Sequence, residues 1–428
     1  MSANHPAPSP AADTSLTVVL PLAFVAVFMA FACWTLLAVM GVHLKETLAL
    51  TSTAFGLLLA TPVLVGGLMA IPLGLAVQAF GARKVIIGCL AGLSLVLTSL
   101  MLVESYLGLL FVAGGLGLSV GLFISGLNYV VSHSPTSRMG LALGCCGSGM
   151  SGAAFSYLAV PLIHEAYSWQ AAPLAYVLVL CLTMVLILLL TDPDPPSGWN
   201  PELRQSIKAL HRSHLSAFGL NYSVLFGGFM ALALWLPDYL SAHYGIPLRQ
   251  SASLAMMFIL PGALAQIGGG WLADRAGPRH VLRWSMLACL LALLVLSYPP
   301  MSLSVRGIDE IYIIEFRLPL TVAMGLLILL SGVMGIGLGS LLRQLYDIFP
   351  NTVGIAAGAT LLMACMAAFT LPLLFGVAND LVGVRNIAFM LLFGMTLVAL
   401  VVSEWAGRIE ERQRIMEETR QLTEKTLG

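Results

Sequence analysis

Twelve long apolar stretches, separated by short polar segments, are the feature that most constrains the fold of this chain. Each is close to the roughly 20 residues that a helix needs to cross a bilayer. Only 9% of the 428 residues are Asp, Glu, Lys or Arg, against about 25% in soluble domains. The pattern excludes an ordinary soluble enzyme and predicts an all-α integral membrane protein with twelve transmembrane helices. The expected spans are 17–43, 52–79, 85–103, 107–132, 140–163, 170–191, 216–240, 251–273, 282–300, 318–341, 354–377 and 386–406.

The basic residues are unequally divided between the two sides of these spans. Fifteen of the 20 Lys and Arg residues fall in one set of alternating segments and five in the other. Because cytoplasmic loops carry the excess of positive charge, both termini are predicted to be cytoplasmic. The net charge is zero and no basic run occurs, so no binding of nucleic acid is expected.

A motif that recurs after 196 residues divides the chain into two halves. Residues 74–84 read Gly-Leu-Ala-Val-Gln-Ala-Phe-Gly-Ala-Arg-Lys, and residues 270–280 read Gly-Trp-Leu-Ala-Asp-Arg-Ala-Gly-Pro-Arg-His. Each copy closes a predicted span, the second and the eighth. The repeat predicts two pseudo-symmetric six-helix bundles with a polar linker between them. The expected parts are a disordered cytoplasmic N-terminus over 1–16, bundles over 17–191 and 216–406, a cytoplasmic linker over 192–215 and a charged helical tail over 407–428.

The repeated motif resembles the signature of the major facilitator superfamily, Gly-x-x-x-Asp-Arg-x-Gly-x-Arg-Arg. The resemblance implies two bundles that rock around a site near the bilayer midplane, with the motif helping to close the cytoplasmic side. Asp274 and Arg275 keep the pattern, but Gln78 replaces the first Asp, so the first-half latch should lack a charge pair. The cytoplasmic gate is therefore expected to contain Gly74, Gln78, Gly81, Arg83, Gly270, Asp274, Arg275, Gly277 and Arg279.

Four segments further resemble the nitrate/nitrite porters: 31–35, 55–64, 138–152 and 227–237. In that family a small oxyanion lies between two arginines, on the second and eighth helices. The register places Ala70 and Gln266 at those two positions, and Met150 stands where the family has an Asn. Since no Lys or Arg replaces them in mid-span, a substrate other than nitrate is expected.

The predicted substrate pathway is lined by uncharged side chains. An amide in hydrocarbon needs hydrogen-bonding partners, so Asn and Gln are stronger candidates than Ser and Thr, which often bond their own helix backbone. Gln266 is the first candidate because of its place in the repeat. The full set is Gln266, Asn128, Tyr129, Asn221, Tyr222, Ala70, Met150 and Thr61.

Three hypotheses about function remain open. The combination of a nitrate-porter-like frame without the arginines resembles magnetosome-membrane permeases of magnetotactic bacteria, which implies an iron species as substrate and an inner or magnetosome membrane as location. The second hypothesis is a small inorganic anion such as nitrate or nitrite, or a neutral solute. The third is a scaffold without transport that binds a protein partner through the tail.

No cofactor or enzymatic activity is expected, because no nucleophile–base pair or metal-ligand spacing is present. The metal site is likewise left unassigned. Oxygen ligands suit a hard cation, and weak candidates are Asp309, Glu310 and Glu315.

Overall fold

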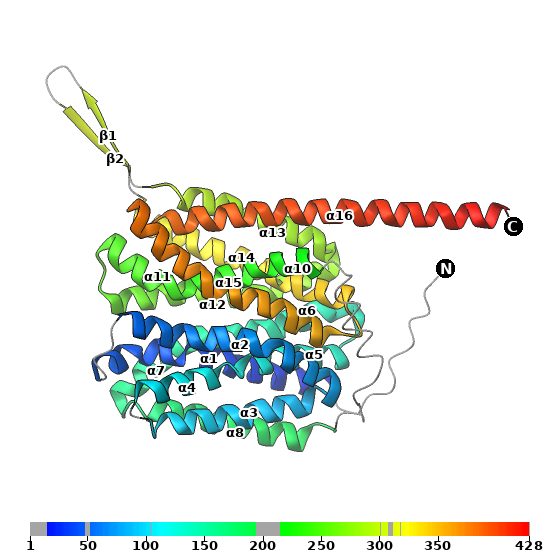
Figure 1. Cartoon of the computed structure of the whole chain (residues 1–428), viewed down its shortest axis with the longest axis horizontal. Helices are drawn as coiled ribbons and strands as arrows, with labels where there is room; N and C mark the ends of the chain where they lie inside the picture. Colours follow the sequence, from blue (N-terminus) through cyan, green and yellow to red (C-terminus); the bar gives the residue numbers. More distant parts are fainter. Residues whose placement is uncertain are drawn as a thin grey trace.

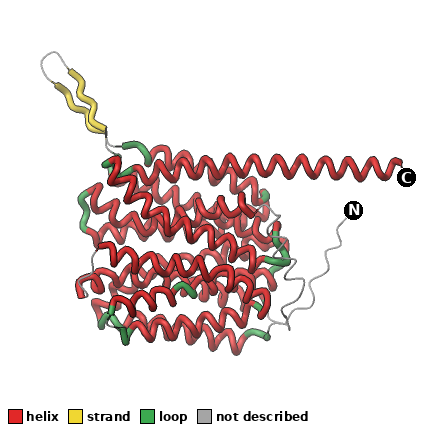
Figure 2. The backbone as a smooth tube through the Cα atoms, viewed as in Figure 1, coloured by secondary structure: helices red, strands yellow, loops and turns green. Residues whose placement is uncertain are grey.

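The computed structural model describes residues 15–47, 52–103, 105–193, 215–299, 301–306, 311–316 and 318–427. Within these ranges, twelve helical segments are long and apolar enough to cross a membrane. They lie side by side in one bundle (Figures 1 and 2). The predicted all-α membrane fold with twelve spans is confirmed.

The first half contributes six spans, two of which are built from more than one helical piece. The fourth span joins α4 to α5, and the fifth joins η1, α6, η2 and α7. The bounds are α1 (Leu16–Thr47), α2 (Ser52–Phe80), α3 (Ala82–Leu100), α4 (Tyr106–Leu116), α5 (Ser119–His133), η1 (Thr136–Arg138), α6 (Met139–Gly147), η2 (Ser148–Met150), α7 (Ser151–Ala166) and α8 (Ala171–Leu190).

The second half contributes the other six spans, and its first span contains a π-helical turn, η3. Such single wide turns inside α-helices are frequent at functional sites. The bounds are α10 (Leu215–Tyr222), η3 (Ser223–Gly227), α11 (Gly228–Tyr244), α12 (Leu248–Ala276), α13 (Pro278–Leu296), α14 (Leu320–Ile348), α15 (Val353–Val382) and α16 (Ile387–Leu427).

The two repeated motifs form the same tight turn. Gly81 separates α2 from α3 with φ 92°, and Gly277 separates α12 from α13 with φ 85°. A side chain strongly disfavours such positive φ values, which explains the glycine at both positions. We call the end of the bundle at which these turns lie the motif end; the charge count predicts that it is cytoplasmic.

A two-stranded antiparallel hairpin replaces the loop expected between the ninth and tenth spans. Strand β1 (Met301–Arg306) pairs with β2 (Ile311–Phe316), and the hairpin projects from the helical bundle (Figure 1). Asp309 and Glu310, two of the weak metal candidates, lie outside the described residues. Glu315 lies in β2, where its backbone pairs with that of Ser302. A metal site here stays a prediction.

The charged tail is not a separate helix but the continuation of the twelfth span. Helix α16 runs without a break from Ile387 to Leu427. The predicted linker over 192–215 lies almost entirely outside the described residues, and so does the N-terminal segment over 1–16. The proposed domain boundaries at these segments stay predictions.

Candidate functional site

Glycines line two seams along which the halves contact each other. Helix α2 packs against α15, and α12 packs against α6. A Cβ placed on Gly74 would overlap the carbonyl of Gly354, and one on Gly270 would overlap the carbonyl of Gly140. Without side chains at these points the backbones approach closely, as small residues allow in membrane helices.

One turn further into the bundle the two seams repeat the same contact. The Ala70 carbonyl lies against Gly358, and the Gln266 carbonyl lies against Gly144. The offset is 196 residues for α2 and α12, and 214 for α6 and α15. The halves therefore meet pseudo-symmetrically, with Ala70 and Gln266 at equivalent positions.

The Gln266 side chain is buried where the halves meet, with 3% of the residue exposed. Its Nε2 donates to Met150 Sδ at 3.8 Å, and its Oε1 lies against Gly147. A thioether is a weak acceptor. The amide thus keeps donor capacity that no strong acceptor among the described residues uses.

Aromatic side chains from both halves also contact one another. The Phe31 ring lies 5.8 Å from that of Phe123 at an interplanar angle of 86°, and 6.1 Å from that of Phe226 in η3. Trp34, 7% exposed, packs on Phe31 at 5.7 Å. The buried Trp34 Nε1–H has no hydrogen-bond partner among the described residues. We call Phe31, Trp34, Phe123 and Phe226 the aromatic cluster; Phe123 and Phe226 carry no signal in the sequence that marks them as part of a site.

The remaining pathway candidates do not converge on one point. Thr61 donates to its own helix at Leu57 O, 2.7 Å away. The Tyr129 ring contacts His133 at 4.9 Å, and Tyr222 stacks on Phe226 at 5.5 Å.

The two asparagines lie on different surfaces. A Cβ on Gly354 would lie 3.3 Å from Asn128 Nδ2, which puts Asn128 at the α2–α15 seam. Asn221 donates from Nδ2 to Ser403 Oγ at 3.2 Å, inside the second half. Of the candidates, Gln266 and Met150 touch each other, and Tyr222 reaches the aromatic cluster.

At the motif end a carboxylate bridges the two halves. The N–H groups of Gly140 and Leu141 donate to the two oxygens of Asp274, each at 2.8 Å. These amides belong to the first turn of α6, where they lack a partner within the helix. Arg343 of α14 lies 3.2 Å from the same carboxylate and donates to Thr136 O at 2.6 Å.

The first-half motif makes a neutral counterpart of this bridge. Gln78 Nε2 donates to the backbone carbonyl of Asn351 at 2.8 Å. Arg83 stays within its own half and donates to Thr191 Oγ1 at 2.9 Å and Leu188 O at 3.2 Å, at the end of α8.

The two arginines of the second motif, Arg275 and Arg279, have different neighbours from those of Arg83 in the first motif. The Arg275 guanidinium lies 4.0 Å above the ring centre of Trp271. Arg279 lines a cavity inside the second half.

A family model for the Major Facilitator Superfamily matches residues 22–369. The chain belongs to the Major Facilitator Superfamily. It is accordingly a multi-pass membrane transporter of this superfamily, as the sequence motif predicted.

Among relatives in this superfamily, the chain is 27% identical over 400 residues to the "Probable nitrate/nitrite antiporter NarK1" of Thermus thermophilus, covering 90% of each chain. It is 27% identical over 378 residues to the "Nitrite extrusion protein" of Bacillus subtilis, covering 88% of this chain and 90% of the relative.

Solved structures share the superfamily fold at low identity. The human organic anion transporter MFSD10 matches with a TM-score of 0.73 at 17% identity, covering 91% of this chain and 99% of the other. The transporter FucP in its outward conformation matches with a TM-score of 0.68 at 17% identity, over 90% of this chain and 98% of the other.

Proposed function

We propose that the chain moves a small monovalent inorganic anion of the nitrate or nitrite type across the membrane by alternating access. The observation that carries this proposal is the buried Trp34 Nε1–H in the aromatic cluster where the halves meet, which has no hydrogen-bond partner within the described part of the chain. The nitrate and nitrite transporters among the relatives support the same substrate class. Ala70 and Gln266 alone predict a substrate other than nitrate, but the relatives favour this anion class.

Neutral hydrogen-bond donors replace the water around a weakly hydrated monovalent anion more readily than the water around a strongly hydrated one. Trp34 offers one N–H, and Gln266 offers an NH₂ group that, among the residues the structure describes, donates to the Met150 thioether alone. Aromatic edges carry partial positive charge and add to this field. Because the cost of transferring an ion from water is large and grows with charge, this donor set favours a monovalent anion over a divalent one.

Closure of the motif end supports alternating access. Asp274 joins α12 to the first turn of α6, and Arg343 ties α14 to Thr136. We propose that breaking these contacts opens the cytoplasmic side while the two bundles rock around the seam at Gln266.

Uptake of labelled nitrate and nitrite into proteoliposomes tests this proposal. Trp34→Phe keeps an aromatic ring and removes the N–H, and Gln266→Leu removes the amide at similar volume. We expect each to lower uptake at least tenfold, since losing one hydrogen bond to a charged group costs about 1.5 to 3 kcal/mol.

The matched control is Trp235→Phe, which alters a tryptophan that packs on Tyr239 and Phe389 within the second half. It should transport like the unaltered protein. Uptake of nitrate that survives both Trp34→Phe and Gln266→Leu contradicts the proposed binding site.

The iron species in a magnetosome membrane stays a prediction from the resemblance, as does the scaffold without transport. Within the part of the chain that the structure describes, no group of three or more His, Cys, Asp or Glu side chains could hold a metal ion. The same proteoliposomes, loaded with an iron-sensitive dye, distinguish iron transport from anion transport. Accumulation of ferrous iron without nitrate uptake would favour the iron hypothesis.

A further inference from the structure

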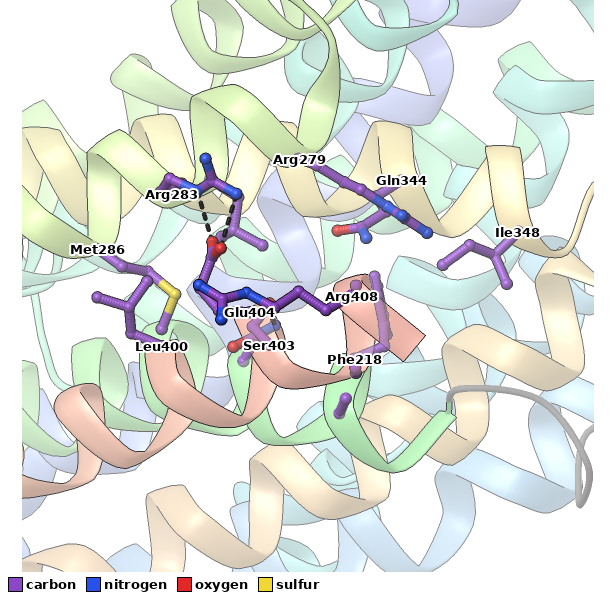
Figure 3. Close-up of a pocket in the computed structure, with 15 residues that line it drawn as sticks. Phe218, Arg279, Arg283, Met286, Gln344, Ile348, Leu400, Ser403, Glu404 and Arg408 are labelled. Atoms are coloured by element: carbon purple, nitrogen blue, oxygen red, sulfur yellow. Dashed lines mark hydrogen bonds and ion pairs between the residues drawn. The ribbon is translucent and has the colours of Figure 1, made fainter. Parts of the chain in front are cut away.

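A polar cavity of about 450 Å³ lies inside the second half, away from the seam between the halves. Four helices line it: α10, α13, α14 and α16 (Figure 3). Its volume falls within the roughly 300–1,000 Å³ typical of small-ligand sites. Neither the gate contacts of Asp274 nor the aromatic cluster uses it.

The cavity arises where the two halves depart from their symmetry. In the first half Arg83 bonds the end of α8 through Leu188 O and Thr191 Oγ1. Arg279 is its repeat partner, but α16 has no end at the corresponding level, since it continues to Leu427. Arg279 lines the cavity, as do Gly407 and Arg408 of α16.

The lining carries excess positive charge. Among the described residues that line the cavity, three are arginines, Arg279, Arg283 and Arg408, and one is a carboxylate, Glu404. Arg283 Nη2 donates to Glu404 Oε2 at 2.7 Å, shown by the dashed lines in Figure 3. The charge favours an anion, and arginine is well suited to phosphate.

Two buried carbonyl oxygens in the lining have no hydrogen-bond partner among the described residues. They are Asn221 Oδ1, in a residue that is 3% exposed, and Gln344 Oε1. Buried polar atoms are nearly always paired, so two in one cavity indicate a ligand that donates hydrogen bonds. A ligand that fits both features has an anionic group for the arginines and hydroxyl groups for the amides.

Exposed tryptophans place the cavity at the depth of the membrane–water interface. Trp284 is 59% exposed and follows Arg283; Trp405 is 65% exposed and follows Glu404. Tryptophan concentrates at the headgroup level of bilayers. Nearer the start of α16, Leu397, Val398 and Val401 expose an apolar surface that suits acyl chains.

We propose that this cavity binds the phosphoglycerol headgroup of an anionic phospholipid. The phosphate lies among the three arginines, and the glycerol hydroxyls donate to Asn221 Oδ1 and Gln344 Oε1. The acyl chains lie along the exposed face of α16. Basic cavities between membrane helices at the cytoplasmic face are suited to such headgroups.

Native mass spectrometry of the full-length protein in detergent, titrated with phosphatidylglycerol, tests the proposal. Arg408→Gln should weaken binding about fivefold, because one arginine near an anionic headgroup contributes about 1 kcal/mol. The matched control is Arg412→Gln, one turn further along the same helix and outside the cavity, which should change binding less than twofold. Asn221→Leu, which removes a hydrogen-bond acceptor, should also weaken binding.

Comparisons of binding between two lipids, between two arginine variants, and between the lipid and glycerol 3-phosphate decide whether the proposal holds. Phosphatidylcholine, which has the phosphate but no hydroxyl donor, should bind at least tenfold more weakly than phosphatidylglycerol. Equal binding of the two lipids, or equal effects of Arg408→Gln and Arg412→Gln, overturns the proposal. Glycerol 3-phosphate that binds as tightly as the lipid, with the same dependence on Arg408, assigns the cavity to a soluble phosphate ester and overturns the lipid.

Discussion

Replacing Asp274 with Asn should loosen the closed motif end by an amount that the structure allows to be estimated. The carboxylate accepts two backbone hydrogen bonds at 2.8 Å and pairs with Arg343 at 3.2 Å. Asn keeps one acceptor oxygen but turns an NH₂ group toward the second backbone N–H, and it loses the charge. A hydrogen bond to a charged group contributes about 1.5 to 3 kcal/mol, so the closed state should lose about 2 kcal/mol.

Hydrogen exchange of the amides at the start of α6 measures this loss directly. The N–H groups of Gly140 and Leu141 lack a partner within α6, so their protection depends on Asp274. A loss of about 2 kcal/mol corresponds to about 30-fold more opening. Exchange at these two amides should therefore be about 30-fold faster in Asp274→Asn.

Asp347→Asn provides the matched control. Asp347 also pairs with Arg343, at 3.2 Å, but it is not a partner of the α6 amides. Exchange at Gly140 and Leu141 should rise less than threefold in this variant. Equal acceleration by both substitutions, or unchanged protection in Asp274→Asn, would show that the carboxylate does not hold the two halves together.

Two further predictions concern stability, one through close packing and one through buried hydrogen bonds. Gly270→Ala places a Cβ against the backbone of α6 and should lower stability by about 1 to 3 kcal/mol, whereas Gly268→Ala, with nothing within 4 Å, should melt like the unaltered protein. Asn386→Leu removes hydrogen bonds of 3.0 Å to both Leu296 O and Tyr298 O and should cost about 1 to 3 kcal/mol. Thermal unfolding in detergent measures both; a normal melting temperature in Gly270→Ala or Asn386→Leu would refute the corresponding argument.

The membrane spans were predictable because hydropathy and length decide them, but their ends depend on turn chemistry. The ninth span was expected over 282–300, whereas α13 covers Pro278–Leu296. Its first turn contains Arg279, which hydropathy assigns to a loop. The helix begins there because Gly277 makes the turn and Pro278 is favourable in a first helical turn.

Of the candidate site, only the positions related by the sequence repeat were predictable. The repeat gave the register that makes Ala70 and Gln266 equivalent. The contacts among Phe31, Phe123 and Phe226 join distant parts of the chain, and a phenylalanine in an apolar helix carries no local signal. They were found only in the structure.

Asn221 and Tyr222 were both expected in the pathway, but neighbours on a helix point about 100° apart. Tyr222 reaches the aromatic cluster, whereas Asn221 lines the cavity in the second half. The sequence alone does not tell whether a buried amide lines the transport pathway or the cavity in the second half. The packing of α10 against its neighbouring helices decides this for Asn221.

The unbroken α16 has a mechanical consequence. From Ile409, where its apolar span ends, to Leu427 the helix continues for 18 residues, or about 27 Å at 1.5 Å per residue. A helix of this kind is a stiff rod rather than a tether, so any body attached to its tip is held at a set distance and angle from the bilayer. Tilting of the twelfth span during the transport cycle would swing that tip through a wide arc, which makes the tip a natural place for a spectroscopic reporter of the cycle.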